Sequence, residues 1–450
     1  MDAPYPLSDI ADRLLSAAQA AGADAADTVV TEDMSLSVDV LNGALEHAER
    51  SEGREAGLRV FVGKRQACVS AASFSDTSIA AMAERAVAMA RTAPEDRFSG
   101  LAEPSDLARA WDIDAFELND PAPEREPAEL KDDALAAEAS ALQVAGVTKV
   151  ASATAAVGRR RFHLSASNGF SGGYTRSSQH VSCVAITGHG TEMERDYFGE
   201  VRTFRADLPP PDEIGRFAGE RAVARAGARK PPTGAFPVLF DERVASSLIG
   251  HLLSAVNGSA VARGASWLSD AMGEPILPAG LSVIEEPHRP RVSGSKPFDA
   301  EGLPTRNRYI VEDGRLVGWT LDLATGRQLD MQSTANAARG GAQPPSPANH
   351  NITLTQGGSD PVGLMRDMGQ GLLVTSMIGA SISPTTGDYS RGASGFWIEN
   401  GEVTYPVNEC TVAGNLRDLL RTLVPSNDAR THQSRVIPSC LVEGLTIAGE

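Results

Sequence analysis

Residues 27–74, DTVVTEDMSLSVDVLNGALEHAERSEGREAGLRVFVGKRQACVSAASF, decide the fold class, because apolar and polar residues alternate along most of this stretch. Successive side chains of a β-strand point to opposite faces, so the alternation indicates strands with one buried face. Asn42-Gly43 and Gly63-Lys64 interrupt it with residue pairs that favour tight turns. The stretch therefore predicts antiparallel strands joined by hairpins.

Helical spacing of apolar residues flanks these strands. We expect a first helix capped by Ser8, running to about Ala21 and ended by Gly22. Further helices are predicted over 76–91, near 128–145 and near 211–226, and further strands over 148–156, 161–167 and 172–188. In this assignment the basic run Arg159-Arg160-Arg161 is a solvated turn between two strands.

The chain has 450 residues, more than one hydrophobic core usually serves, so we expect more than one domain. Proline and acidic residues are concentrated in 94–127, which predicts a linker or surface excursion. It would separate an N-terminal α+β part, 1–93, from a middle α+β part, 128–230, followed by a β-rich C-terminal domain over 231–450. The expected fold class is α+β, with an N-terminal α/β domain containing an antiparallel sheet and helices, and a barrel- or sandwich-like C-terminal domain.

Composition excludes several function classes. A formal net charge of −17 opposes binding to phosphate backbones, so no nucleic-acid partner is expected. No apolar run approaches the roughly 20 residues that span a bilayer, so no membrane association is expected either. The four cysteines are widely spaced, without a CxxC pair, which favours reduced thiols and a cytoplasmic protein.

The stretch FDERVASSLIGHLLSAVNGSA, residues 240–260, is an apolar helix in which a metal site would be expected but its ligands are missing. Two histidines and a glutamate on such a helix could bind Zn²⁺ and activate its water. Here the helix offers one histidine, His251, and no acid beside it. We therefore interpret His251 as a packed or interface residue.

Other polar groups are weaker candidates. Glu285, Glu286 and His288 are interpreted as a solvated turn, and His189 with residues 192–196 as the flank of a strand. Ser390 and Ser394 lack the G-x-S-x-G pattern of a nucleophile elbow. In the same DYSRGASG segment, we expect Asp388, Tyr389 and Arg391 to shape a cavity wall, where exposed strand edges could take an extended peptide.

Residues 379–419, GASISPTTGDYSRGASGFWIENGEVTYPVNECTVAGNLRDL, closely resemble the C-terminal signature of the TldD/PmbA family, also called modulators of DNA gyrase. Segments 57–70, 193–202 and 296–313 and the ending LVEGLTIAGE support the resemblance, which covers essentially the whole chain. The family has two branches: TldD, a zinc metalloprotease subunit with a His-Glu-x-x-x-His helix and a C-terminal Cys ligand, and its partner PmbA, or TldE.

The chain resembles the PmbA/TldE branch. Matching 240–260 to the TldD helix places Gly250, His251 and Ala255 at the His, Glu and His positions. The resemblance therefore implies a degenerate motif, with no catalytic and no metal-binding residue in this chain. Cys440 lies near the place of the TldD cysteine but a few residues late, and we interpret it as a core thiol.

The resemblance implies a cytoplasmic subunit of a TldD-containing metalloprotease that cleaves unfolded or leader peptides and is not catalytic alone. It implies no cofactor in this chain and zinc in the TldD-type partner. Substrate or partner binding is assigned to His251, Asp388, Tyr389 and Arg391, and the isolated chain is expected to be able to form a homodimer. Two alternatives stay open: a standalone peptidase with a displaced metal site of His251, Cys440 and an acid, and a non-proteolytic regulator that binds gyrase.

Overall fold

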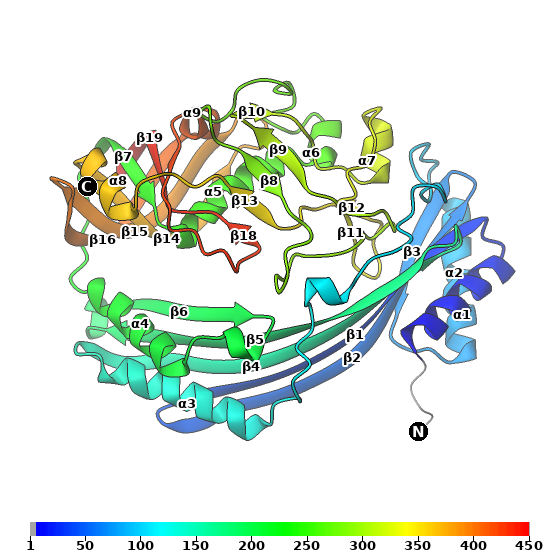
Figure 1. Ribbon diagram of the computed structural model, residues 1–450, viewed down its shortest axis with the longest axis horizontal. Helices are drawn as coiled ribbons and strands as arrows, with labels where there is room; N and C mark the ends of the chain where they lie inside the picture. Colours follow the sequence, from blue (N-terminus) through cyan, green and yellow to red (C-terminus); the bar gives the residue numbers. More distant parts are fainter. Residues whose placement is uncertain (1–5, 450) are drawn as a thin grey trace.

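The computed structural model describes residues 6–449 and has the expected α+β fold (Figure 1). Residues 1–5 and Glu450 lie outside the described part, and with them the start of the predicted 1–93 part and the last residue of the LVEGLTIAGE ending. The first half of the chain contains, in order, α1 (Leu7–Ala20), β1 (Ala25–Leu41), β2 (Ala44–Val62), β3 (Arg65–Ala71), α2 (Asp76–Thr92), α3 (Pro127–Gln143), β4 (Val147–Ala166), β5 (Ser171–Thr187), β6 (Glu194–Arg202) and α4 (Pro211–Ala224).

These strands form one curved antiparallel sheet in the order β3-β2-β1-β4-β5-β6. The 1–93 and 128–230 parts thus contribute to the same sheet, because β1 pairs with β4 from residue 27 to residue 40. Asn42 and Gly43 both have positive φ, as the predicted hairpin turn between β1 and β2 requires. The cap of α1 was predicted wrongly: Pro6 is its N-cap and Ser8 lies inside the helix.

The prediction of a turn at Arg159-Arg160-Arg161 is wrong. The run lies within β4, a continuous strand of 20 residues. Its charges are balanced across the sheet, where Arg160 and Arg161 pair with Asp33 and Glu32 of β1. Local charge density suggested a break in the strand, but the compensating acids are more than a hundred residues away in sequence.

The two faces of the sheet differ in chemistry. Along β1, the buried apolar residues Ala26, Val30, Leu36, Val38 and Val40 all point to the convex face. There, α1 and α2 pack against one end of the sheet, and α3 and α4 against the other (Figure 1). Asp27, Thr31, Asp33 and Ser35 alternate with them and point to the concave face. This face of β1 is therefore largely polar, apart from Val29, which belongs to one hydrophobic cluster with Phe298 of the C-terminal domain above it.

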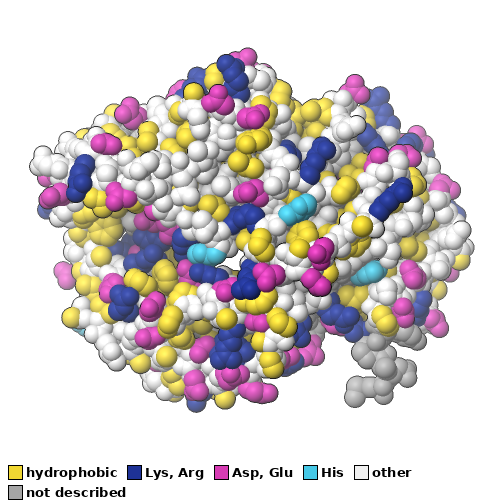
Figure 2. Space-filling view, in the orientation of Figure 1, with side chains coloured by type: hydrophobic (Ala, Val, Ile, Leu, Met, Phe, Trp, Pro, Cys, Tyr) yellow, Lys and Arg dark blue, Asp and Glu magenta, His cyan; other side chains and the backbone are white. Residues whose placement is uncertain are grey.

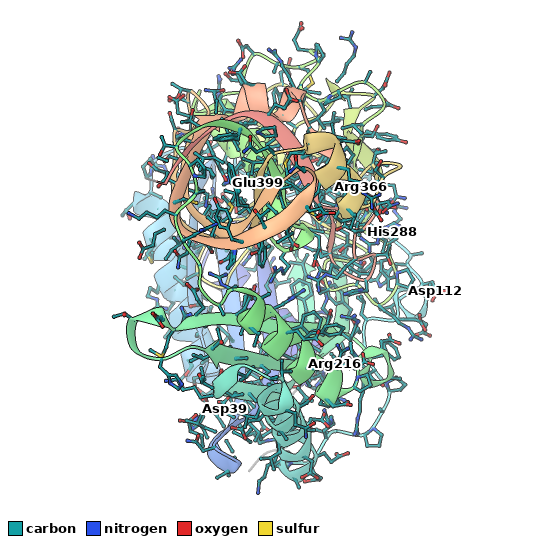
Figure 3. All side chains as sticks on the ribbon, turned by 90° about the vertical axis from the view of Figure 1, so that its left-hand side faces the viewer. Asp39, Asp112, Arg216, His288, Arg366 and Glu399 are labelled. Atoms are coloured by element: carbon teal, nitrogen blue, oxygen red, sulfur yellow. The ribbon has the colours of Figure 1, made fainter. Side chains whose placement is uncertain are left out.

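The C-terminal domain contains a closed barrel of β16, β15, β14, β7 and β19, seen nearly end-on in Figure 3 around the label of Glu399. Its elements are β7 (Gly234–Phe240), α5 (Glu242–Ala255), α6 (Gly258–Ala262), β8 (Val283–Glu285), β9 (Arg308–Glu312), β10 (Arg315–Leu316), α7 (Leu323–Gln328), β11 (Ala337–Ala338), β12 (Ser346–Pro347), β13 (Ile352–Leu354), α8 (Pro361–Met368), β14 (Gly371–Ile382), β15 (Asp388–Glu399), β16 (Glu402–Asn415), α9 (Leu416–Arg421), β17 (Val424–Pro425), β18 (Arg435–Val436) and β19 (Cys440–Ala448). A second sheet has the order β10-β9-β8-β13-β18. Of the two expected forms, barrel and sandwich, the barrel is present.

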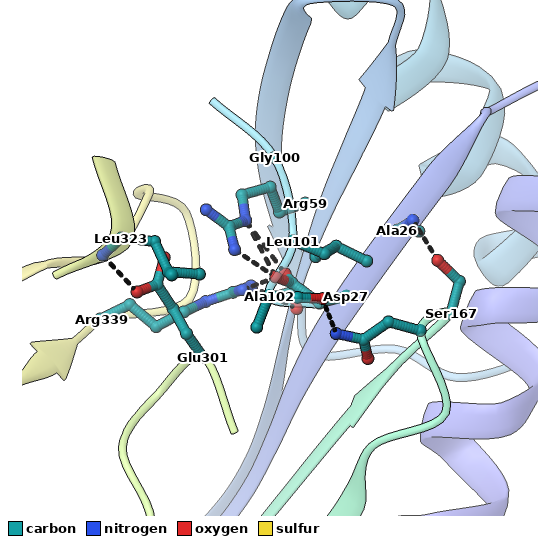
Figure 4. A network of polar contacts seen from close by, with 12 residues as sticks. Ala26, Asp27, Arg59, Gly100, Leu101, Ala102, Ser167, Glu301, Leu323 and Arg339 are labelled. Atoms are coloured by element: carbon teal, nitrogen blue, oxygen red, sulfur yellow. Dashed lines mark hydrogen bonds and ion pairs between the residues drawn. The ribbon is translucent and has the colours of Figure 1, made fainter. Parts of the chain in front are cut away.

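Two polar clusters hold the C-terminal domain to the sheet. At one, the carboxylate of Asp27 on β1 binds the guanidinium groups of Arg59 and Arg339 (Figure 4). At the other, Glu200 on β6 binds Arg430, which also binds Glu242 of α5. Figure 2 shows Lys and Arg side chains gathered where the surface is hollowed between the two layers.

The segment 93–126 contains one short 3₁₀ helix (Asp114–Phe116) and runs between the layers. The ring of Trp111 lies 4.8 Å from that of Phe298, and Arg327 donates to the carbonyl groups of Phe98, Gly100 and Leu101 at 2.8–3.1 Å. The segment is thereby fixed to the C-terminal domain along part of its length.

Candidate functional site

Helix α5 begins at a side-chain cap and buries one apolar face. The carboxylate of Asp241 accepts a hydrogen bond from the Arg243 amide at 3.1 Å, which stabilises the first turn. Leu248, Ile249 and Leu252 are fully buried in the core of the C-terminal domain. The helix lies beside β14 of the barrel (Figure 1). Its half-buried residues, next to the fully buried face, therefore lie close to the barrel strands.

Ser247 and His251 stand one turn apart on that face of α5. The imidazole of His251 packs edge-on against the ring of Tyr389 on β15, with 5.7 Å between ring centroids. Arg391, two residues further along β15, donates to Ser247 Oγ at 3.4 Å. Three of the predicted binding residues, His251, Tyr389 and Arg391, thus form one cluster.

Electrostatics keep this cluster in a defined protonation state. Burial and, as the smaller cause, the nearby guanidinium of Arg391 together lower the pKa of His251 to about 4, so the imidazole is neutral at pH 7. Burial raises the pKa of Tyr389 to about 12, so the phenol stays protonated. The His251 Nε2 atom is buried and has no hydrogen-bond partner among the described residues. The cluster can donate and accept hydrogen bonds, but none of the described carboxylates bonds to His251.

A β-bulge lies opposite Arg391. The pairing of β14 with β15 skips from Ile378 to Ser381, so residues 379 and 380 oppose Arg391 alone. The Arg391 Nε atom donates to the Gly379 carbonyl at 2.7 Å and thereby satisfies an acceptor that the ladder leaves unpaired. Ile378, at the start of the bulge, exposes 78% of its surface. Its side chain lies over Gly392, its partner in the ladder, and therefore on the face opposite to that of Tyr389 and Arg391.

Asp388 does not join the cluster. It alternates with Tyr389 along β15, is exposed, and accepts hydrogen bonds from Thr386 at 2.7 Å and Asn415 at 3.0 Å. The expected exposed strand edge in DYSRGASG is also absent, since β15 pairs with β14 on one side and β16 on the other. An extended peptide therefore cannot add to β15 as a further strand.

The positions implied to be degenerate do not fit a zinc ion. Arg435 lies close to position 250, where a Cβ on Gly250 would stand 3.1 Å from its Nη1 atom, and Ala255 is buried in the core. Cys440 is fully buried on β19, its thiol donates to the Pro438 carbonyl at 3.2 Å, and burial raises its pKa. Cys440 is thus a core thiol, as predicted. Within residues 6–449, no group of three or more His, Cys, Asp or Glu side chains could hold a metal ion.

The prediction of a solvated turn at Glu285 is wrong. Its side chain is 1% exposed, binds Arg308 Nε at 2.6 Å and accepts hydrogen bonds from Asn336 and from the His350 amide. Glu286 is half-buried and His288 is exposed, so the three groups do not converge. The partners of Glu285 come from distant segments, so the local sequence SVIEEPHRP does not predict them.

Further residues of the cluster were not predicted. Met377 Sδ lies 3.7 Å from the Tyr389 hydroxyl and 4.0 Å from Ser247 Oγ. Ser247 could have been found from its spacing of four residues to His251, whereas Met377 belongs to a strand that carries no recognisable signal. Ser394, considered as a nucleophile, accepts a hydrogen bond from Arg225 at 3.0 Å. His189 precedes a short 3₁₀ helix (Gly190–Glu192) that leads to β6 and so flanks a strand as expected, whereas residues 194–196 lie within β6.

None of the helices in the described part of the chain is long and apolar enough to cross a bilayer.

Comparison with protein families gives three matches that together cover most of the chain. They are PmbA/TldA metallopeptidase domain 1 over residues 26–90, the central domain over 120–226 and the C-terminal domain over 233–449.

Individual relatives are similar over nearly the full length. The chain is 35% identical to metalloprotease PmbA of Escherichia coli O157:H7, over 95% of this chain and 93% of that protein. A crystal structure of a candidate modulator of DNA gyrase from Bacteroides thetaiotaomicron superposes with a TM-score of 0.91, at 26% identity, covering 98% of this chain and 99% of that one. TldE from Thermococcus kodakarensis has the same fold, with a TM-score of 0.84, 19% identity, and 97% and 99% of the two chains covered.

Proposed function

Because this chain belongs to the PmbA/TldD metallopeptidase family, we propose that it is the PmbA/TldE-type subunit of a TldD-containing metalloprotease that cleaves unfolded or leader peptides. In this proposal the TldD-type partner supplies Zn²⁺ and the general base. The present chain closes the reaction space, excludes folded proteins and helps to hold an extended peptide. We place the complex in the cytoplasm, and expect a homodimer when the chain is isolated from its partner.

The observation that carries the proposal is the charge environment of His251. A histidine that binds Zn²⁺ in an enzyme usually donates its second N–H to a carboxylate or carbonyl, which raises its basicity. The His251 imidazole instead faces the guanidinium of Arg391, a cation that would repel a metal ion. Gly250 and Ala255 offer no ligand beside it. This helix therefore suits a binding surface and not a catalytic centre.

The cluster suggests how such a surface would act. Arg391 offers N–H donors and His251 a neutral imidazole, while exposed Ile378 offers apolar contact on the opposite face of the same strand pair. Such a mixture of one apolar anchor and a few polar groups is typical of peptide contacts. We assign substrate or partner contact to these residues.

Reconstitution tests this function. Purified chain is mixed with its cognate TldD-type subunit, complex formation is followed by size-exclusion chromatography, and cleavage of an unfolded peptide is measured. We expect Arg391→Ala to reduce complex formation or cleavage at least about tenfold, the loss of one charge-assisted hydrogen bond. Asp388→Ala is the matched control, since Asp388 is adjacent in sequence but points away. Equal activity of wild type and Arg391→Ala would show that Arg391 does not contact the substrate or the partner. Binding of gyrase by the chain without the TldD-type subunit would favour the non-proteolytic regulator instead.

A further inference from the structure

A cavity of about 330 Å³ lies between the concave face of the N-terminal sheet and the C-terminal domain. Its polar lining includes four cationic side chains, from Arg160, Arg176, Lys296 and Arg339. The acids of the lining are Asp33 and Glu55. The cavity is therefore cationic in a chain whose net charge is −17, and no residue of the proposed binding cluster lines it.

Part of this positive charge is already compensated. Arg339 is paired with the buried carboxylate of Asp27, and Arg160 with Asp33. Two cations have no such partner among the described residues. Both terminal nitrogens of Arg176 donate to main-chain carbonyl groups, of Ser293 and Ser295, which carry no net charge.

Lys296 is the second cation that forms no ion pair with a described carboxylate. Its ammonium group donates no hydrogen bond to any described residue, and the residue is half-buried. Burial and the nearby guanidinium of Arg176 lower the pKa of Lys296, against the weaker attraction of Asp299 and Glu285. A desolvated ammonium group gains most from an anion in direct contact.

A second cavity, of about 770 Å³, continues along the same face and shares Asp33, Glu55, Arg160 and Arg176 with the first. Its lining is rich in small residues, such as Ser51, Gly53 and Ser178. The combined space exceeds what one small anion needs and falls in the size range of sites for larger ligands. A ligand with an extended backbone and one anionic group fits this shape and charge.

We infer that Lys296 and Arg176, with the Asp33-paired Arg160 in the same cavity wall, form an anion site that binds a carboxylate of an extended peptide lying along the concave face of the sheet. The inference deepens the proposed function and rests on it for the identity of the ligand as a peptide. The carboxylate is either an acidic side chain or the C-terminus of the peptide. Peptides with acidic residues would accordingly bind this chain better than neutral ones of the same shape.

Binding to the full chain alone, without the TldD-type subunit, tests the inference. Fluorescence anisotropy is measured with labelled Gly/Ser peptides that carry either central glutamates or glutamines, each with a free or an amidated C-terminus. We expect the glutamate peptide to bind at least about tenfold more tightly. A preference that follows the free C-terminus instead assigns the site to the terminal carboxylate.

Lys296→Met should abolish the preference, and Lys149→Met, an exposed lysine on the same sheet and outside both cavities, should preserve it. Arg160→Gln serves as the second variant, because its side chain is 63% exposed and its replacement leaves the core intact. Equal binding of all four peptides, or an unchanged preference in Lys296→Met and Arg160→Gln, would overturn the inference. Absence of cleavage in the reconstituted mixture, with the binding preference retained, would count against the proposed function alone.

Discussion

Arg339 and Asp27 are 312 residues apart in the sequence and form a buried ion pair in which neither side chain is more than 2% exposed. Arg59 of β2 binds the same carboxylate, with its Nε atom 3.0 Å from Oδ2 (Figure 4). One buried carboxylate therefore compensates two guanidinium groups, one from the sheet and one from the C-terminal domain. Because these charges are removed from water, they stabilise the fold only while every charged partner is present.

Removing Asp27 should accordingly be costly. We expect Asp27→Ala to lower the free energy of unfolding by about 3–5 kcal/mol, because it leaves two buried cations without a counter-charge. Denaturant unfolding measures the change. The control is Glu220→Gln, which breaks an exposed pair with Arg216 on α4 and should change stability by less than about 0.5 kcal/mol. Similar effects of the two substitutions would contradict this account of the cluster.

Two glycines of β2 make a matched pair for testing how the C-terminal domain approaches the sheet. A Cβ on Gly57 would collide with the main chain of Gly341, whereas a Cβ on Gly53 meets nothing. Gly57→Ala should destabilise the protein by about 1–3 kcal/mol, as overpacking does, and should increase proteolysis of the loop around residue 341. Gly53→Ala should be close to neutral. The close approach would be refuted if both variants behaved alike.

Glu200 should make the stability depend on acid pH. Burial alone would raise the pKa of this carboxyl, but the His432 imidazole, 3.3 Å away, and the charges of Arg202 and Arg430 lower the pKa from 4.5 to about 2. Since the folded-state pKa lies below the unfolded one, the stabilisation is present above 4.5 and is lost as the pH falls towards 2. Glu200→Gln should therefore be less stable than wild type at neutral pH, with a difference that shrinks at roughly pH 3. A stability difference between Glu200→Gln and wild type that does not change with pH would contradict this role of Glu200. Glu192→Gln serves as the control, because Glu192 is exposed.

The effect of the Arg391 guanidinium on the pKa of His251 can be measured by NMR titration of the histidine ring. Burial is the larger cause of the lowered pKa and Arg391 the second, so Arg391→Gln should raise the pKa of His251 from about 4 only part of the way to 6.5. Asp388→Asn, on the opposite side of β15, should leave it unchanged. An unaltered pKa in Arg391→Gln would show that the guanidinium does not act on the imidazole.

Much of the fold could be predicted because the local spacing of apolar residues determines the helices and strands. The alternation over 27–74 and the helical spacing over 76–91 give β1 to β3 and α2 nearly to the residue. The Arg159-Arg160-Arg161 run was misjudged because its acids lie on β1, and strand pairing over such separations is not visible in a single segment. The burial of Glu285 was missed for the same reason, since Arg308, Asn336 and His350 reach it from separate segments.

The candidate site was predictable in its residues but not in its geometry. Period-two alternation already separates Asp388 from Tyr389 and Arg391, so the odd-numbered pair could have been assigned to one face. That this face meets His251 depends on how α5 packs against the barrel, which no local pattern encodes. The bulge opposite Arg391 was equally hidden, because it arises from the register of β14 against β15.

The most direct test of the central claim is the metal content and peptidase activity of the purified chain, alone and after mixing with its cognate TldD-type subunit. We expect a metal-free chain that is inactive alone and supports cleavage of an unfolded peptide in the mixture. Stoichiometric zinc that survives dialysis against a chelator, together with cleavage by the chain alone, would contradict it.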